Sequence, residues 1–493
     1  MNVRSIFEQY PGLLETLQQN RLKVFLVGGA VRDFLLNKST RDLDFIVDGD
    51  AASLARRIAN QLGSAFYILD PERNTARVLL RSNESQKMVL DFARLRGAEL
   101  KDDLCDRDFT INAIALDLET LQFVDPLRGT SDLLAGILRV CSTGSFSNDP
   151  VRVLRAVRFS VYYRLKMLAE TRNLLREATA LLPAVSGERI RDELFRILQG
   201  DQSYIAIRIL VQLDVLKYIF HLSRNENLLL PPAAEIRQPW EKALATLKHL
   251  ELFFDVLVGS RDADASENLL VGSIVLSLGE FRYHLETHFN QPMNPDRSLK
   301  ALLALSILMA EWIENQTQTA GEDAACAVVK DKIEELGKFL ALSVKEIHRV
   351  KAIITNRNAY YSISAAGNPP NRREIYHFFR KVNAAGIDIC LFCLCEILVA
   401  FGLDVDQQVW HTQLSRCKMM FDAWWNHHDS IVDPFPLING EELMYELALQ
   451  PSVLVGRLLE EVRAAQAAGE ISTPQEAYAL ARQVLQLSGE DEE

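Results

Sequence analysis

The sequence predicts an α+β fold, with a mixed-sheet domain at the N-terminus and helical regions after it. Over roughly the first 145 residues, short β-rich runs such as KVFLVGG, DLDFIVDG and KMVLDFARLR alternate with helical segments such as AASLARRIANQLG. From Asp149 onward the apolar residues recur with the period of a helix, as in VRVLRAVRFSVYYRL and GERIRDELFRILQ. We therefore expect one sheet-containing domain followed by all-α regions.

Length and charge limit the class of protein. A chain of 493 residues is too long for one core, so several domains are expected. The formal net charge of -12 argues against a protein that coats nucleic acid. Between Arg152 and Arg208, however, basic residues exceed acidic ones by roughly five, which predicts a local basic patch.

The apolar segments predict core and no membrane span. No run approaches about 18 uninterrupted apolar residues, and the N-terminus lacks the pattern of a secretory leader, so we expect a cytoplasmic protein that does not bind a membrane. Cys390, Cys393 and Cys395 lie in the apolar run DICLFCLCEILVAF without the spacing of zinc ligands. They are predicted to be buried core thiols.

The stretch from Val24 to Gly49 places two aspartates on a predicted strand. Residues two apart on a strand project from one face with Cα atoms about 6.5 to 7 Å apart, so Asp42 and Asp44 are expected to share a site. Two carboxylates that close repel each other unless cations hold them, and a pair of Mg2+ ions that clamps a phosphoryl transfer is the natural occupant. We predict Asp42 and Asp44 as catalytic metal ligands and Mg2+ as the cofactor.

A glycine pair precedes this strand. Gly28 and Gly29 stand where the first strand turns into the helix AVRDFLL, so backbone amides can approach a triphosphate closely, although a simple turn also explains such a pair. Arg32 on the first helical turn adds a positive charge to this predicted nucleotide site. Asp91 in VLDFARLRG lies on a later predicted strand and is either a third metal carboxylate or an edge-strand residue.

The segment NDPVRVLRAVRF is predicted to read a base. Asp149, Arg152 and Arg155 follow one another at spacings of three, so one helical face is expected to present an acceptor and two forked donors. An Asp acceptor beside an Arg donor matches the amino group and ring nitrogen of cytosine or adenine and mismatches uracil and guanine. The simpler alternative is an exposed, salt-bridged helix start.

Taken together, these motifs resemble a known family. A strand, GG, a helix with VRD and then DLD on the next strand is similar to the nucleotidyltransferase superfamily. With DRDFTINAIALD, DPLRGTSDLLAGILRV, NDPVRVLRAVRF, GERIRDELFRIL and the C-terminal FPLINGEELMYELALQPSVLVGRLLEEV, the chain resembles class II tRNA nucleotidyltransferases and related bacterial poly(A) polymerases. The resemblance implies a polymerase-β-like catalytic head (1–145), a helical neck with the nucleotide-selecting motif (146–205), a helical body (206–435) and a helical, tRNA-binding tail (436–493).

The resemblance also implies roles for residues in two motifs. In the second motif, Arg107 and Asp108 would contact the ribose 2'-hydroxyl, unless they form only a structural ion pair; Asp106 replaces the first arginine of the family pattern. In the fourth motif, Asp149 and Arg152 would select CTP and ATP without a nucleic-acid template. There Asn148 replaces the usual glutamate, which alters the expected support of Arg152.

Two further motifs are expected to be structural. Pro126 and Gly129 in DPLRGTSDLL would form the turn of a hinge between the sheet and the helical neck. Glu188, Arg189 and Glu193 in GERIRDEL resemble the motif that braces the neck helix.

The resemblance implies addition of CMP to the 3' end of tRNA from CTP, with release of pyrophosphate. CCA-adding and A-adding relatives carry a flexible loop of roughly ten to twenty extra residues before the second motif, whereas few residues lie here between Arg96 and Asp103. Such a short connection cannot act as the flexible loop that would reorient Asp149 and Arg152 and so change the specificity of the pocket from CTP to ATP. We expect a CC-adding enzyme and a separate A-adding enzyme acting on the same tRNA.

Alternative functions stay open at this point. They are full CCA addition with ATP as the second nucleotide, a poly(A) polymerase, and a catalytically silent RNA-binding relative, against which the intact Asp42 and Asp44 argue. A metal-dependent phosphohydrolase would need more ligands than His427, His428 and Asp429 of NHHDS supply.

Overall fold

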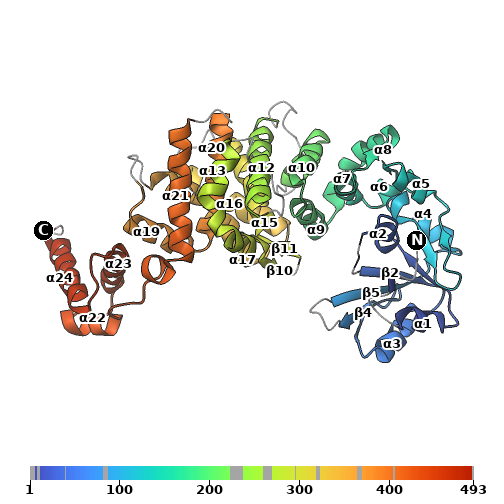
Figure 1. Ribbon diagram of the computed structural model, residues 1–493, viewed down its shortest axis with the longest axis horizontal. Helices are drawn as coiled ribbons and strands as arrows, with labels where there is room; N and C mark the ends of the chain where they lie inside the picture. The colour runs from blue at the N-terminus through green and yellow to red at the C-terminus, as the bar shows by residue number, and fades with distance from the viewer. Residues whose placement is uncertain are drawn as a thin grey trace. The chain divides into compact units, whose positions relative to one another are not determined.

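The computed structural model describes residues 6–7, 12–38, 40, 42–81, 87–221, 237–258, 269–294, 296–317, 322–363, 369–402 and 406–490. Arg41 of the first motif lies outside them. The chain divides into two compact units, Met1–Glu193 with Gln212–Ile219, and Leu194–Val211 with Phe220–Glu493 (Figure 1). The four domain ranges expected from the sequence are finer than this division and stay predictions.

The first unit contains a seven-stranded sheet in the order β3-β4-β5-β2-β1-β6-β7. The neighbours β2 and β5 run parallel and the other neighbouring pairs antiparallel, so the predicted mixed sheet is confirmed. The strands are β1 (Val24–Val27), β2 (Asp42–Val47), β3 (Ala65–Asp70), β4 (Thr75–Arg81), β5 (Lys87–Arg94), β6 (Ala115–Asp117) and β7 (Phe123–Val124). Because β1 and β2 are neighbours, the end of β1 lies beside the aspartates of β2.

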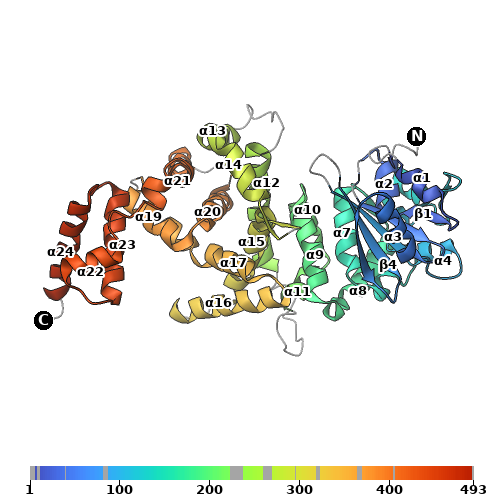
Figure 2. The ribbon, with the colours of Figure 1, turned by 90° about the horizontal axis from the view of Figure 1, so that it is seen from below.

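One face of this sheet is covered by helices. Helix α3 (Ala51–Gln61) begins after Asp50, whose side chain accepts a hydrogen bond from the Ser53 amide at 3.0 Å. Its buried apolar side chains form one cluster with those of α1 (Leu13–Gln18) and with alternate residues of β2, β4 and β5. Figure 2 shows α3 beside β4. The rings of Phe45 and Phe92 stack in this cluster at 4.9 Å between centroids. This packing fixes which residues of β2 point away from the core.

The opposite face is covered only in part. Around β1 and β6 it carries a small apolar cluster, which consists of Phe25, Val27, Ile46, Leu104, Ala113 and Ala115. Over β2, β5 and β4 the same face presents Asp42, Asp44, Asp91 and Arg77, which are exposed or half-buried. The predicted metal ligands therefore project from the partly open face of the sheet.

Short helices surround the sheet and lead into the helical part. They are α2 (Gly29–Leu35), α4 (Leu100–Cys105), α5 (Gly129–Leu134), α6 (Ser145–Asn148), α7 (Arg152–Tyr162), α8 (Ala169–Thr179), α9 (Gly187–Leu198) and α11 (Val215–His221), with 3-10 turns η2 (Thr110–Asn112) and η3 (Leu182–Ala184). Gly129 starts α5 in close contact with η2, since a Cβ atom there would lie 2.0 Å from the Thr110 carbonyl oxygen. The glycine of the predicted hinge is thus required by packing.

The second unit is almost entirely helical, as predicted. Its helices are α10 (Ser203–Gln212), α12 (Arg237–Leu257), α13 (Leu269–Leu278), α14 (Arg282–Asn290), α15 (Leu299–Thr317), α16 (Glu322–Phe339), α17 (Val344–Thr355), α18 (Arg357–Ser362), α19 (Arg372–Val382), α20 (Ala385–Phe401), α21 (Gln407–Trp425), α22 (Gly440–Leu447), α23 (Val453–Ala468) and α24 (Pro474–Glu490), with single turns η4 (Gly279–Phe281) and η6 (His428–Val432). The short pair β10 (Pro292–Asn294) with β11 (Arg297–Ser298) interrupts the helical pattern that we expected from Asp149 onward. In the first unit, β9 (Lys166–Met167) does so as well, where it pairs with β8 (Ile137–Leu138).

The apolar helix α20 lies in the core of the second unit. Cys390, Cys393 and Cys395 are 0% exposed, which confirms the predicted core thiols, and burial raises the pKa of each well above its ordinary value. Within the described residues no single helix is long and apolar enough to cross a membrane; α19 and α20 pass that test only as a pair bent by 107°.

Candidate active site

Asp42 and Asp44 lie on the same face of β2, as the strand prediction requires. Asp42 is exposed, whereas Asp44 is half-buried between the glycine turn at the end of β1 and the parallel strand β5. Burial is the main cause that raises the pKa of Asp44 above its ordinary value; the Arg107 guanidinium opposes this shift, and Asp91 and Asp42 add to it. A cation at this position would therefore stabilise the charged carboxylate.

The donor set fits Mg2+. Mg2+ is bound in nucleotide enzymes by one or two carboxylates together with substrate phosphates and water, which does not require a full protein cage. The described part of the chain contains no group of three or more His, Cys, Asp or Glu side chains arranged to hold a metal. Asp42 and Asp44 provide the two carboxylates, and their assignment as ligands stays a prediction.

Asp91 is paired with an arginine. It lies directly opposite Asp44 on β5, but its Oδ1 accepts from Arg77 Nε at 2.7 Å and its Oδ2 from Arg77 Nη2 at 2.8 Å. This two-point pair raises the pKa of Arg77, with the hydrogen bonds to Asp91 as the largest cause. In this arrangement both carboxylate oxygens of Asp91 are occupied.

The glycine turn lies against the second motif. Gly28 has φ of 75°, a left-handed conformation that favours glycine. A Cβ atom on Gly28 would lie 3.0 Å from Arg107 Nη1 and 3.6 Å from Asp44 Oδ2. Helix α2 begins at Gly29, directly after this turn, as predicted. The structure thus brings Gly28 and Asp44 of the first motif together with Arg107 of the second.

Arg32 lies in a buried network behind the glycine turn. Its side chain is almost fully buried, and Nη1 donates to Asn112 Oδ1 while Nε donates to Asp33 Oδ1 at 3.0 Å. Its guanidinium also lies over the Tyr163 ring, 4.4 Å from the centroid. Arg32 places a positive charge near the turn, but its described contacts are structural, so direct nucleotide binding stays a prediction.

Asp108 of the second motif forms an ion pair with Arg155 of the fourth. Asp108 Oδ1 accepts from the Phe109 amide at 2.8 Å and from Asn112 Nδ2 at 2.9 Å, and Oδ2 lies 2.8 Å from Arg155 Nη2. Asn112, which the sequence did not single out, thereby joins Asp108 to Arg32. The sequence does not reveal this role of Asn112, because Arg32 lies 80 residues away along the chain.

The predicted base-reading face needs a correction. Asp149 is not on the helix: it has extended backbone (φ -150°, ψ 91°) and lies between α6 and Arg152, the first residue of α7. Asp149 and Arg152 are still adjacent, with Arg152 Nε 3.8 Å from Asp149 Oδ2. Arg155 pairs with Asp108 instead. The proline after Asp149 and the turn that follows it delay the helix, so the three side chains do not form one helical row.

The other nitrogens of Arg152 hold the backbone of the second motif. Nη1 donates to Ser145 Oγ at 2.8 Å and to the Arg107 carbonyl at 3.3 Å, and Nη2 donates to the Asp106 carbonyl at 2.9 Å. The side chains of Asp106 and Asn148, where the chain departs from the family pattern, are exposed. Arg152 therefore positions the second motif as well as standing beside Asp149.

Arg189 is a further residue of this site. It lies near the start of α9, and its Nη2 donates to Asp149 Oδ2 at 2.8 Å. Glu193 on the same helix accepts from Arg158 Nε at 2.9 Å, in line with the structural role expected of it. From the sequence Arg189 is expected only to brace the neck, because nothing in its spacing indicates that it would reach Asp149.

Four polar atoms of the site lack hydrogen-bond partners. Within the described residues these buried atoms are Arg107 Nε, Asp108 Oδ2, Asp149 Oδ1 and Arg155 Nε. Asp108 Oδ2 is close enough to Arg155 for an ion pair but is not aligned to accept a hydrogen bond. Buried polar groups are rarely left unpaired because that costs free energy. Arg107 Nε likewise has an ion-pair partner, Asp103 Oδ1 at 3.6 Å, so Asp149 Oδ1 and Arg155 Nε are the acceptor and the donor that a polar ligand would satisfy.

The connection between β5 and α4 is short and tied down. It comprises residues 95–99, where the Leu95 amide donates to the Val47 carbonyl at 2.9 Å and the Arg96 amide to Asp103 Oδ2 at 3.1 Å. The amides of Ala98 and Glu99 both donate to Asp102 Oδ2 at 3.1 Å. The connection that is predicted to be too short to act as a lever is thus held by hydrogen bonds at most of its backbone amides.

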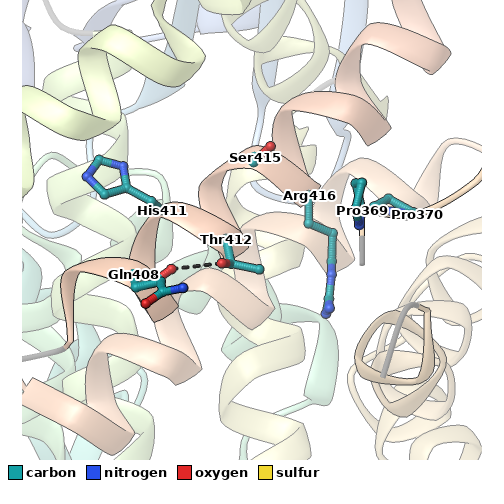
Figure 3. A pocket seen from close by; sticks show the side chains of 7 residues that line it. All are labelled: Pro369, Pro370, Gln408, His411, Thr412, Ser415 and Arg416. Carbon is teal, nitrogen blue, oxygen red and sulfur yellow. Dashed lines mark hydrogen bonds between the residues drawn. The ribbon is translucent and has the colours of Figure 1, made fainter. Parts of the chain in front are cut away.

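Other candidate groups lie apart from these residues in sequence. His427 is 3.5 Å from Asp422, and His428 Nδ1 lies 3.1 Å from the Trp424 carbonyl, so both histidines have structural partners within their own helix end. A pocket of about 470 Å³ in the second unit is lined by Pro369, Pro370 and residues of α21 (Figure 3). It contains none of the predicted site residues.

Comparison with known proteins relates these features to one family. Residues 24–139 match the model of the poly(A) polymerase head domain, and residues 165–223 match a probable RNA and SrmB-binding site of polymerase A. The chain is 28% identical to the CC-adding tRNA nucleotidyltransferase of Synechocystis sp. over 93% of each chain. It is also 28% identical to the A-adding tRNA nucleotidyltransferase of Deinococcus radiodurans, over 92% of this chain and 94% of the relative.

Solved structures share the fold. A CCA-adding enzyme in complex with ATP superposes with a TM-score of 0.62 at 20% identity, over 98% of this chain and 99% of the other. The Thermotoga maritima CCA-adding enzyme complexed with tRNA gives 0.56 at 20% identity, over 96% and 94% of the two chains. The family models and the relatives that match most of the chain identify a nucleotidyltransferase. More narrowly, the chain belongs to the family of class II tRNA nucleotidyltransferases and the bacterial poly(A) polymerases related to them.

Proposed function

We propose that this protein adds two cytidylates to the 3' end of tRNA in the cytoplasm, using CTP and releasing pyrophosphate. The observation that carries the choice of CC is the short, hydrogen-bonded connection between β5 and α4. A segment with so little freedom cannot act as the lever that would change the pocket from CTP to ATP. A separate A-adding enzyme would then complete the same tRNA.

Asp42 and Asp44 would hold Mg2+. When bound, Mg2+ stabilises the charge on the triphosphate and favours ionisation of the attacking 3'-hydroxyl. The glycine turn would accept the triphosphate close to its backbone, because Gly28 has no side chain to obstruct it. Arg107, whose guanidinium lies close to both Gly28 and Asp44, would supply a positive charge for the phosphates or a donor for the ribose.

Asp149 and Arg152 would select the base. The unpaired Oδ1 of Asp149 can accept a hydrogen bond from the exocyclic amino group of cytosine, while Arg152 offers a donor for the ring nitrogen. Uracil presents a carbonyl oxygen and an N–H at these positions. Its carbonyl oxygen would face the Asp149 acceptor, and its N–H would face the Arg152 donor, so neither hydrogen bond could form. This mismatch supports CTP over UTP and does not by itself exclude ATP, whose amino group and ring nitrogen have the same pattern.

The test uses three tRNAs that end before CCA, after C and after CC, each incubated with CTP, with ATP and with both, followed by sequencing of the products. We expect CMP on the first two substrates and no addition to the third. Terminal AMP on the third substrate after CMP addition to the others would indicate a CCA-adding enzyme. AMP on the third substrate alone would indicate an A-adding enzyme, and long adenylate runs a poly(A) polymerase.

A further inference from the structure

A row of side chains crosses the open face of the sheet from its edge to the predicted metal ligands. In the strand register Tyr67 on β3 pairs with Arg77 on β4, Arg77 with Asp91 on β5, and Asp91 with Asp44 on β2. Residues opposite each other on neighbouring strands project from the same face of a sheet. The row is therefore continuous with the site that holds Asp44.

The outer end of this row is apolar and exposed. Strand β3 pairs only with β4 and forms an edge of the sheet. Its central residues Tyr67, Ile68 and Leu69 are 52%, 48% and 50% exposed. Large apolar side chains on an exposed edge strand promote aggregation. Edge strands therefore usually carry polar residues or are covered by other elements, unless the apolar side chains belong to a binding site. Tyr67 is on the face of the catalytic aspartates, whereas Ile68 is on the opposite face.

A positive charge lies next to the tyrosine. The Arg77 side chain is 41% exposed and is held against Asp91 through two hydrogen bonds. That pairing fixes the guanidinium on the face between Tyr67 and the aspartates. An exposed aromatic ring beside a cation is the combination by which open sheets bind single-stranded RNA, since the ring stacks on a base and the cation attracts the phosphates.

The length of the row matches a short RNA end. Three steps between neighbouring strands, at about 4.8 Å each, place Tyr67 roughly 14 Å from Asp44 across the sheet. Stacked nucleotides rise by about 3.4 Å each, so this distance corresponds to about four nucleotides, or fewer if the chain is extended. A protein strand could also pair with β3, but only an RNA end must reach Asp44 to react.

We propose that Tyr67 and Arg77 bind the unpaired 3'-terminal nucleotides of the tRNA, with Tyr67 stacking on a base that precedes the reacting end and Arg77 contacting a backbone phosphate. This inference rests on the proposed function, because it takes Asp44 as the place of reaction. It assigns a substrate-binding role to the edge strand β3, which the sequence analysis did not identify.

The test is a double-mutant cycle on binding of the full-length protein. Dissociation constants are measured for wild type and Tyr67→Ala with a tRNA that carries its unpaired 3' nucleotides and with the same tRNA cut back to the paired acceptor stem. Removal of the unpaired nucleotides should weaken binding to wild type at least about fivefold more than binding to Tyr67→Ala. Tyr67→Phe should behave like wild type. Equal losses in wild type and Tyr67→Ala would overturn the proposal.

Two further variants sharpen the result. Ile68→Ala, on the opposite face of the same strand, should retain the wild-type coupling, and loss of coupling in this variant would show that β3 is merely destabilised. Arg77→Gln should lower the slope of log affinity against log salt by about one, and an unchanged slope would remove the phosphate contact. If Tyr67→Ala altered only self-association in solution, β3 would be a protein-pairing edge and the proposal would fail.

The two proposals can fail separately. CMP addition by wild type is measured on the same preparations. If the cycle shows coupling while wild type adds no CMP, the RNA-binding face stands and the proposed function falls. If wild type adds CMP normally and the cycle shows no coupling, the proposed function stands and the role of Tyr67 is overturned.

Discussion

The environment of Asp44 predicts how the reaction responds to pH. Burial raises its pKa, and the carboxylate must be ionised to bind Mg2+, so the rate should fall as pH decreases through a value above that of an ordinary aspartate. Because Mg2+ competes with the proton, more Mg2+ should move this acidic limb to lower pH. Single-turnover CMP addition measured across pH at two Mg2+ concentrations checks this prediction. An acidic limb independent of Mg2+ would contradict the assignment.

Replacing either aspartate, Asp42 or Asp44, by asparagine removes its negative charge and tests directly whether it binds the metal. Asp44→Asn and Asp42→Asn should each lower the rate of addition by at least about 10³-fold, since the metal-held charge stabilisation is lost. Binding of tRNA, measured on the same preparations, should stay near the wild-type value. Near-normal addition in either variant would show that the carboxylate is not a metal ligand.

Arg189 is predicted to control base selection through Asp149. Its Nη2 donates to Asp149 Oδ2 at 2.8 Å and so leaves Oδ1 as the acceptor for a base. In Arg189→Gln the carboxylate can rotate, and the preference for CTP over UTP in kcat/KM should fall by about tenfold, as for one weakened charge-assisted hydrogen bond. Glu188→Gln, the neighbouring residue, serves as the control. If Arg189→Gln keeps the full preference, Arg189 is only a brace of the neck.

At the scale of the element, helix α5 depends on the absence of a side chain at Gly129. A Cβ atom there would lie 2.0 Å from the Thr110 carbonyl oxygen, so Gly129→Ala must separate α5 from η2. We expect a loss of at least about 2 kcal/mol in local stability. Hydrogen exchange of residues 108–134 measures this effect. Since η2 carries Asn112, the contacts to Arg32 and Asp108 should loosen as well.

A second glycine provides the control for this prediction. Gly456 lies inside α23 with helical backbone, and a Cβ atom added to it would meet no described atom within 4 Å apart from its chain neighbours and the backbone of its own helix. Gly456→Ala should therefore stabilise α23 by about 0.5 to 1 kcal/mol. If both substitutions had the same effect on hydrogen exchange, packing of α5 against η2 would not be the cause.

At the scale of the whole molecule, the tRNA is predicted to contact both units of the chain, the first through its 3' end and the second through the tail. The candidate active site belongs to the first unit, whereas the predicted tRNA-binding tail belongs to the second. The tail has its own apolar core around Leu443 and Leu458, yet Tyr445 in the tail and Phe435, the residue directly before the tail, are 90% and 87% exposed. Exposed aromatic side chains of this kind are suited to stacking on RNA.

The double variant Phe435→Ala/Tyr445→Ala should raise KM for tRNA by about tenfold and leave KM for CTP unchanged, because no core contact is removed. Steady-state kinetics with each substrate varied in turn measures both constants. Leu276→Ala, in which an 85% exposed residue outside the tail is replaced, is the matched control. A rise in KM for CTP, or an equal effect of Leu276→Ala, would contradict a tRNA-binding role of the tail.

The sequence by itself determined the features that depend on neighbouring residues. Alternation on β2 placed Asp42 and Asp44 on one face, the glycine pair marked the turn before α2, and the apolar run of α20 indicated buried cysteines. Local sequence did not indicate β3, because its central residues are exposed and lack an alternating pattern. Only the tertiary structure decided that Arg189 reaches Asp149, that Arg155 pairs with Asp108 and that Asp91 is held by Arg77. These contacts join residues far apart in the chain, and their partners are set by strand order and helix packing, which periodicity cannot reveal.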